Sequence, residues 1–149
     1  MGIDGPCSVR TGSGAEVLAI HVATVRLFLH VLAATVWVGG QLTLAGLVPG
    51  LRAISPDAPR IVARRFNQLA WPAYSVLVVT GIWNVTAVHA SWHGTYGITL
   101  MAKIAVVALS GLSAWAHTVS RSTVGLAVWG AVTGTSALVA LFLGVLLHG

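Results

Sequence analysis

The sequence is poor in charge, in acidic residues and in cysteine. Charged residues make up 7% of the 149 positions, and the three acidic ones, Asp4, Glu16 and Asp57, all lie outside the long apolar segments. Paired carboxylates for acid–base hydrolysis are therefore missing from these segments. Cys7 is the single cysteine, which excludes an intramolecular disulfide and a multi-cysteine metal site. No glycine-rich loop followed by Lys and Ser or Thr is present to bind nucleotide phosphates. These absences argue against an enzyme and favour a binding or transport protein.

What remains is strongly apolar: 56% of the residues are hydrophobic. Four apolar segments stand out, at about residues 22–48, 69–88, 98–117 and 123–147. Each is long enough to cross a hydrocarbon core of about 30 Å as a helix, and none alternates with the period of two that a membrane barrel needs. We therefore predict one domain over residues 1–149, an all-α integral membrane protein folded as an up-and-down bundle of four transmembrane helices.

Proline and arginine positions predict the connections and the orientation. Pro49, Pro56 and Pro59 are expected to break the chain after the first helix, and Pro72 to lie in the first turn of the second. Two connections hold all the loop arginines, which are Arg52, Arg60, Arg64, Arg65 and Arg121. The connection at 89–97 holds no Lys or Arg, so the positive-inside rule places it and both termini on the extracytoplasmic side. The net charge of +5 is thus a topology signal and not a sign of nucleic-acid binding.

A polar stripe runs along the first apolar segment. At about 100° per residue, Arg26, His30, Trp37 and Gln41 fall on one narrow face of a helix. Ionisable residues inside a membrane helix mark a site by default. Lys103 of the third segment has a depth that matches that of His30, so these five residues are predicted to line one outward-facing cavity. Alternatively, Arg26 and Lys103 extend along the apolar surface to the lipid headgroups.

Two further stripes are visible in the later segments. Thr99, Lys103, Ser110 and His117 give the third segment a polar face, and the fourth segment has a stripe of small residues at Thr133, Ser136, Ala140 and Gly144. A stripe of small residues favours close helix packing, within the bundle or between copies. The tryptophans have alternatives as well: Trp37 fills space beside a helix crossing, and Trp71 and Trp92 anchor the chain at the membrane interface.

Histidine is the only side chain type here that offers several metal ligands. His89 and His93 are spaced four apart, which on a helix directs both rings to the same side. We predict them as a site where metal first binds, with the alternative that both are solvated loop residues.

Several motifs in order resemble the CopD-type copper resistance membrane proteins. They are HVLAATVWVGG at 30–40, VPGLR at 48–52, RFNQLA at 65–70, VTGIWN at 79–84 and YGITLMAK at 96–103. The resemblance implies a multi-pass module of the bacterial cytoplasmic membrane in copper transport or homeostasis, with His30, Trp37 and Lys103 at positions typical of the family. We predict His30 as the central metal ligand, with His89 and His93 as the ligands of the entry site. The expected partners are copper ion, membrane lipid, a periplasmic copper protein or a second copy, with no nucleic acid.

The charges leave a second interpretation open. Cu(I) prefers thiolate and thioether ligands, yet the only methionines are Met1 and Met101, and Arg26 and Lys103 would repel a cation. An alternative ligand is haem b or another porphyrin, with His30 as axial ligand and Arg26 and Lys103 on the propionates. The first helix also resembles, more distantly, the HemJ-type membrane protoporphyrinogen oxidases. A third interpretation is an accessory subunit of a larger membrane complex.

Overall fold

The structure, a computed structural model, describes residues 22–87 and 92–147, and throughout these ranges the regular elements are helices. They are α1 (Val22–Ile54), α2 (Ala58–Ala87), α3 (Gly94–Val119) and α4 (Thr123–Leu146). All four are long and apolar enough to cross a membrane. The predicted all-helical class with four membrane-type helices is thereby confirmed.

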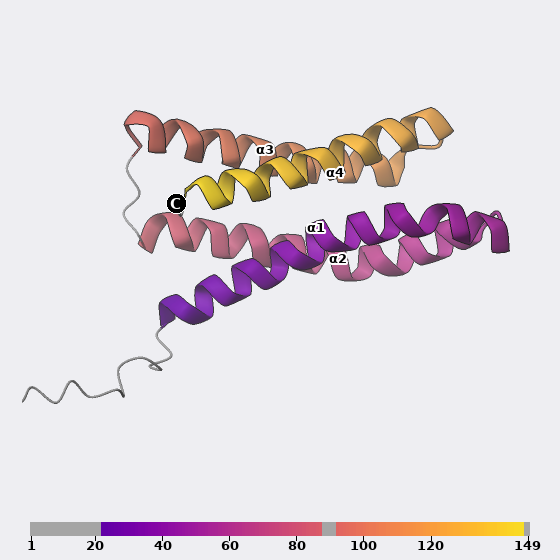
Figure 1. Ribbon diagram of the computed structural model, residues 1–149, viewed down its shortest axis with the longest axis horizontal. Helices are drawn as coiled ribbons and strands as arrows, with labels where there is room; N and C mark the ends of the chain where they lie inside the picture. The colour runs from indigo at the N-terminus through magenta and orange to yellow at the C-terminus, as the bar shows by residue number, and fades with distance from the viewer. Residues whose placement is uncertain (1–21, 88–91, 148–149) are drawn as a thin grey trace, which may run out of the picture.

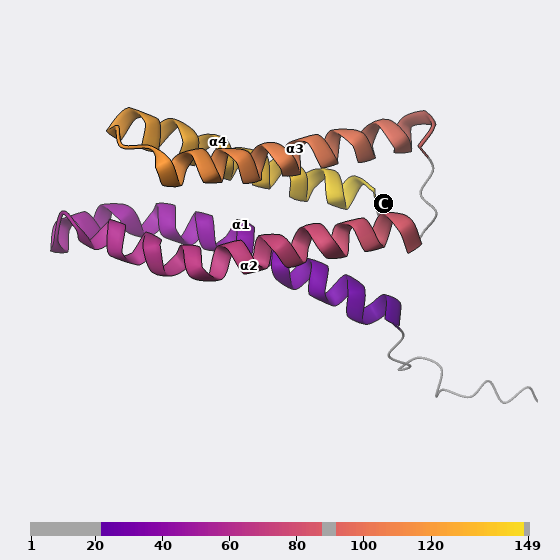
Figure 2. The same cartoon turned by 180° about the vertical axis from the view of Figure 1, so that it is seen from behind.

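The helices form two antiparallel hairpins that lie one over the other (Figure 1). Helix α1 packs closely against α2, and α3 against α4, while α1 also contacts α4. We call the end where α1 begins and α4 ends the terminal end, and the end where α1 meets α2 the arginine end. The first half of α1 diverges from α3 and α4 towards the terminal end, as Figure 2 shows from behind. Consecutive helices run in opposite directions, as expected for an up-and-down arrangement.

The first two helices are longer than predicted. Helix α1 continues through Pro49 to Ile54, and α2 already begins at Ala58, so residues 55–57 alone connect them. Pro72 therefore lies in the interior of α2, and its predicted place in the first turn is wrong. Pro59 occupies an early position of α2, where its missing N–H would have had no partner within the helix. The four arginines expected in the first loop are consequently helical, because only Ser55, Pro56 and Asp57 remain in that connection, whereas Arg121 lies between α3 and α4 as predicted.

The predicted apolar segment falls furthest short of the whole helix in α2. Its 30 residues are about 45 Å long at about 1.5 Å per residue, which exceeds a hydrocarbon core of about 30 Å. The apolar part is the predicted segment that starts at Leu69. The preceding turns are rich in arginine and alanine, which favour helix without being apolar enough for a span. Apolarity thus predicted the membrane-type part of α2 and not the whole helix.

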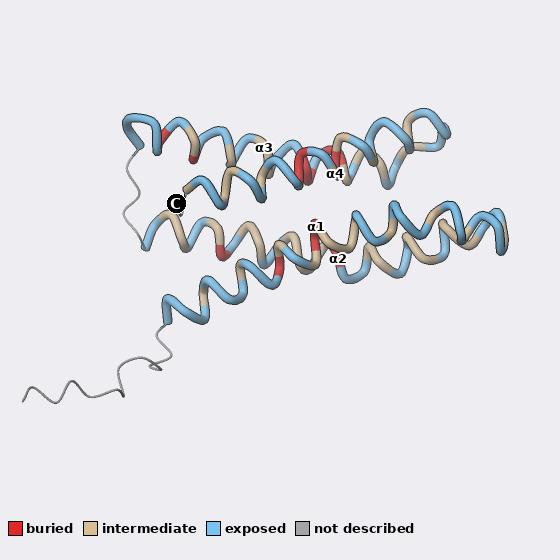
Figure 3. Tube along the Cα trace, in the orientation of Figure 1, coloured by how far each residue is buried: buried red, intermediate tan, exposed pale blue. Residues whose placement is uncertain are grey.

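A small buried core joins the hairpins near the middle of the helices (Figure 3). It consists of Trp37, Val38, Ala70 and Ala137. Many large apolar side chains instead point outwards, among them Leu112 and Phe142, which are 66% and 62% exposed. An apolar outer surface of this kind is the surface that lipid covers.

Candidate functional site

Trp37 links the two hairpins. Its side chain is 4% exposed, and its indole Nε1–H donates a hydrogen bond of 3.1 Å to Ser110 Oγ of α3. Ser110 in turn donates to the carbonyl oxygen of Thr133 in α4 at 3.3 Å. A tryptophan N–H in an apolar core needs an acceptor, so this bond fixes which face of α1 meets α3.

An aromatic cluster surrounds Trp37 on the α2 side. The ring centroid of Tyr74 lies 4.6 Å from that of Trp37, and the Trp71 ring lies 6.0 Å from both. The Tyr74 hydroxyl donates to the carbonyl oxygen of Val107 at 2.9 Å, which gives a second link between the hairpins. Trp71 thus packs against Trp37 and Tyr74 within the bundle and is half-buried there.

The polar face of α3 and the small-residue stripe of α4 meet each other. Thr133 Oγ1 contacts Ser113 Oγ at 3.0 Å, and Thr133, Ser136 and Ser110 are buried. His117 Nδ1–H donates to the carbonyl oxygen of Leu126 at 2.9 Å, nearer the arginine end. Packing of the stripe within the bundle, one of its two predicted uses, is confirmed.

His30 is held by α2. Its Nδ1 lies 2.9 Å from Thr80 Oγ1, and the Thr80 hydroxyl lies 2.6 Å from the carbonyl oxygen of Val76. Because a carbonyl oxygen can only accept, the Thr80 hydroxyl donates its proton to Val76. Thr80 Oγ1 therefore accepts a hydrogen bond from His30 Nδ1–H. In the neutral ring the lone pair is then on Nε2. This is the arrangement that orients a metal-ligating imidazole.

Gly81 allows the His30 ring to lie close to α2. A Cβ atom at Gly81 would lie 3.4 Å from His30 Cε1, at the limit of ordinary contact. His30 therefore rests against the backbone of α2 between Thr80 and Gly81. The VTGIWN motif at 79–84 supplies both residues, although the sequence alone did not link them to His30.

Arg26 lies one turn before His30 on the same face of α1. Its guanidinium carbon is 5.9 Å from the centroid of the Trp83 ring, a cation–π contact with α2. Arg26 Nε is buried and has no hydrogen-bond partner among the residues that the structure describes. A buried cationic donor without an acceptor is costly, so it marks a place where an anionic group would be stabilised.

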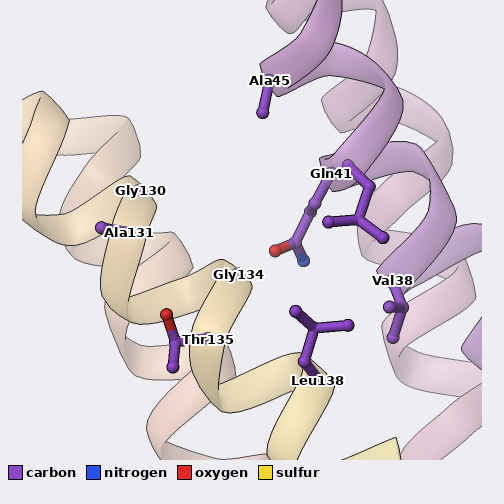
Figure 4. A pocket seen from close by; sticks show the side chains of 9 residues that line it. Val38, Gln41, Ala45, Gly130, Ala131, Gly134, Thr135 and Leu138 are labelled. Atoms are coloured by element: carbon purple, nitrogen blue, oxygen red, sulfur yellow. The ribbon is translucent and has the colours of Figure 1, made fainter.

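The five residues predicted to line one cavity occupy four separate places. Arg26 and His30 lie against α2, Trp37 is in the core, and Gln41 lines a cavity of about 300 Å³ between α1 and α4 (Figure 4). This cavity lies on the arginine-end side of Trp37. Lys103 contacts α4, where a Cβ atom at Gly144 would lie 3.0 Å from Lys103 Nζ. The structure therefore joins Arg26 to His30 but neither of them to Lys103 in a shared cavity.

The other predicted metal ligands do not complete a cluster. His93 is an exposed residue at the start of α3 and makes no side-chain cap bond, whereas His89 lies outside the described residues. Among the residues that the structure describes, no three His, Cys, Asp or Glu side chains are placed to hold a metal ion. The residues that the structure describes thus offer no set of three protein ligands for a metal at His30, whereas a porphyrin would bring its own nitrogen ligands.

Comparison of this chain with protein-family models, curated proteins and solved structures finds no match. The fold and the site define a four-helix chain of membrane type with one oriented histidine beside one cation. The CopD resemblance rests on the motifs quoted above.

Proposed function

We propose that the protein is a multi-pass membrane protein that binds haem or a related metalloporphyrin, with His30 as the axial ligand. One observation carries the proposal: an imidazole oriented by Thr80 lies one turn from an arginine whose buried Nε has no acceptor within residues 22–87 and 92–147. A porphyrin needs one or two axial ligands on the metal and cations near its propionates. A bare metal ion would need several protein ligands and would be repelled by Arg26.

Each residue has a distinct role in this proposal. His30 donates Nδ1–H to Thr80 and would hold the metal through Nε2. Arg26 would donate to a propionate, and its contact with Trp83 holds the guanidinium against α2. The exposed apolar side chains of the first half of α1 would face the porphyrin or lipid. When bound, haem supplies electron transfer or binding of a small ligand at iron.

The test is a titration of the detergent-purified protein with haemin, followed by the Soret absorbance. His30→Ala is expected to abolish the protein-bound band. Thr80→Val keeps the size of the side chain but removes the acceptor for His30 Nδ1–H, so haem affinity should fall by about 10–100-fold. Thr80→Ser should restore most of it. Equal haem binding by wild type and His30→Ala, with both helical by circular dichroism, would overturn the proposal.

Copper handling, which the CopD resemblance implies, is the second candidate. The observation that favours it is the position of His93 at the terminal end of the bundle. His30 lies in the first half of α1, which is the half nearer to this end. Copper would then be the ion that the protein transports, or the ion whose cellular level the protein helps to control. Arg26→Ala separates the candidates because it removes a cation beside the ligand. It should weaken porphyrin binding, whereas copper binding should be unchanged or tighter, and His93→Ala should weaken copper binding only.

We further propose that the arginine end faces the cytoplasm of a bacterium and that the terminal end faces outwards. Arg52, Arg60, Arg64 and Arg65 on α1 and α2, and Arg121 between α3 and α4, support this orientation. The His30 site would then be reached from the extracytoplasmic side.

A further inference from the structure

The start of α2 contains a hollow lined by arginines. Its volume is about 270 Å³, and its lining residues are Arg60, Ile61, Arg64 and Arg65. All four belong to the first turns of α2, which continue beyond its apolar part. The hollow lies at the arginine end of the bundle, whereas the His30 site lies nearer the terminal end.

Positive charge in this hollow is largely uncompensated. Asp57 is the one acidic side chain in the described part of the chain, and it pairs with Arg60 at 3.8 Å. Both side chains of that pair are highly exposed, at 81% and 76%, so the pair is weak. Arg64 and Arg65 have no ion pair with any described residue. Two guanidinium groups are therefore available to an external anion.

Length places the hollow at the level of lipid headgroups. If the apolar part of α2 from residue 69 onwards fills the hydrocarbon core, Arg65 is about 6 Å and Arg60 about 14 Å beyond its boundary, at about 1.5 Å per residue. The headgroup layer extends for about 5–8 Å on each side of the core. Arg64 and Arg65 are thus within this layer, whereas Arg60 and Ile61 are beyond it, on the water side.

We propose that this hollow binds the phosphodiester headgroup of an anionic phospholipid such as phosphatidylglycerol. Guanidinium groups bind phosphate oxygens through two parallel N–H donors, which suits Arg64 and Arg65 better than a point charge would. A zwitterionic lipid carries a cationic group next to its phosphate. The arginines of the hollow repel that group, so they favour an anionic lipid over a zwitterionic one. This lipid site is independent of what His30 binds, so either proposal can fail without the other.

The test is native mass spectrometry of the purified full chain, titrated with phosphatidylglycerol or with phosphatidylcholine of the same acyl chains. We expect phosphatidylglycerol to bind at least tenfold more tightly. Each arginine near an anionic lipid contributes about fivefold in affinity, so the double variant Arg64→Gln/Arg65→Gln should lose about 25-fold. Arg121→Gln is the matched control, because it removes a charge from the same end but outside the hollow, and it should bind as wild type does.

Three results would overturn the proposal. They are equal affinity for the two lipids, unchanged phosphatidylglycerol binding by the double variant, and displacement of the lipid by millimolar inorganic phosphate, which would indicate a site for free phosphate. Circular dichroism checks that the double variant is helical. If it does not fold, Arg64→Gln and Arg65→Gln tested singly should each lose about fivefold, and no loss in either would equally refute the lipid site.

Discussion

Replacing Trp37 should separate the contribution of its ring from that of its N–H. The ring is 4% exposed and contacts Trp71 and Tyr74, so Trp37→Ala removes a large buried side chain at the junction of the hairpins. Truncations of this kind cost about 3–5 kcal/mol in free energy of unfolding. Trp37→Phe keeps an aromatic ring but removes the bond to Ser110, and hydrogen bonds between membrane helices contribute about 0.6 kcal/mol on average and at most about 1.7. The alanine variant should therefore lose several times more stability than the phenylalanine variant.

The assay is reversible unfolding in mixed micelles with increasing sodium dodecyl sulfate, followed by circular dichroism. Trp115→Ala is the matched control, because Trp115 is 60% exposed on α3 and contributes little to the buried core. It should change the unfolding free energy by less than about 0.5 kcal/mol. The reasoning is refuted if Trp37→Ala costs no more than Trp115→Ala, since Trp37 would then not join the hairpins.

Three further substitutions test the packing of the bundle. A Cβ atom at Gly111 would overlap the Tyr74 hydroxyl, so Gly111→Ala should destabilise the protein by about 1–3 kcal/mol in the same unfolding assay. Nothing lies within 4 Å of the corresponding position at Gly39, and Gly39→Ala should stabilise the protein by up to about 1 kcal/mol; equal signs for the two would contradict the packing. Gln41 makes no hydrogen bond to any described residue and lines an apolar cavity, so Gln41→Leu should leave stability unchanged or raise it by about 1 kcal/mol. A loss above about 1 kcal/mol would mean that the amide has a partner of its own.

Periodicity predicted the features that one helix carries by itself. The polar face of α3 and the small-residue stripe of α4 are visible at helical spacing, and the two faces meet where Ser110 donates to the carbonyl oxygen of Thr133. The positions of the four apolar spans follow from hydropathy in the same way. The extension of α2 before Leu69 escaped prediction, because arginine and alanine form helix without being apolar.

Pairings between helices could not be predicted. Nothing in the sequence states that Thr80 accepts from His30 or that Tyr74 donates to Val107, because these contacts depend on the rotation and crossing of separate helices. For the same reason, the predicted match in depth between Lys103 and His30 did not bring the two side chains together, and Lys103 lies against Gly144 of α4. Arg26 and His30, predicted to share one face of a helix, both contact α2, at Trp83 and Thr80.

The most direct test of the His30 proposal is the iron and copper content per chain, combined with the optical spectrum. The protein would be purified in detergent from cells grown with both metals, as wild type and as His30→Ala. Because one axial imidazole binds one porphyrin, we predict about one iron per chain and a Soret band for the wild type. We predict neither in His30→Ala. Stoichiometric copper without iron, or iron retained in His30→Ala, would contradict it.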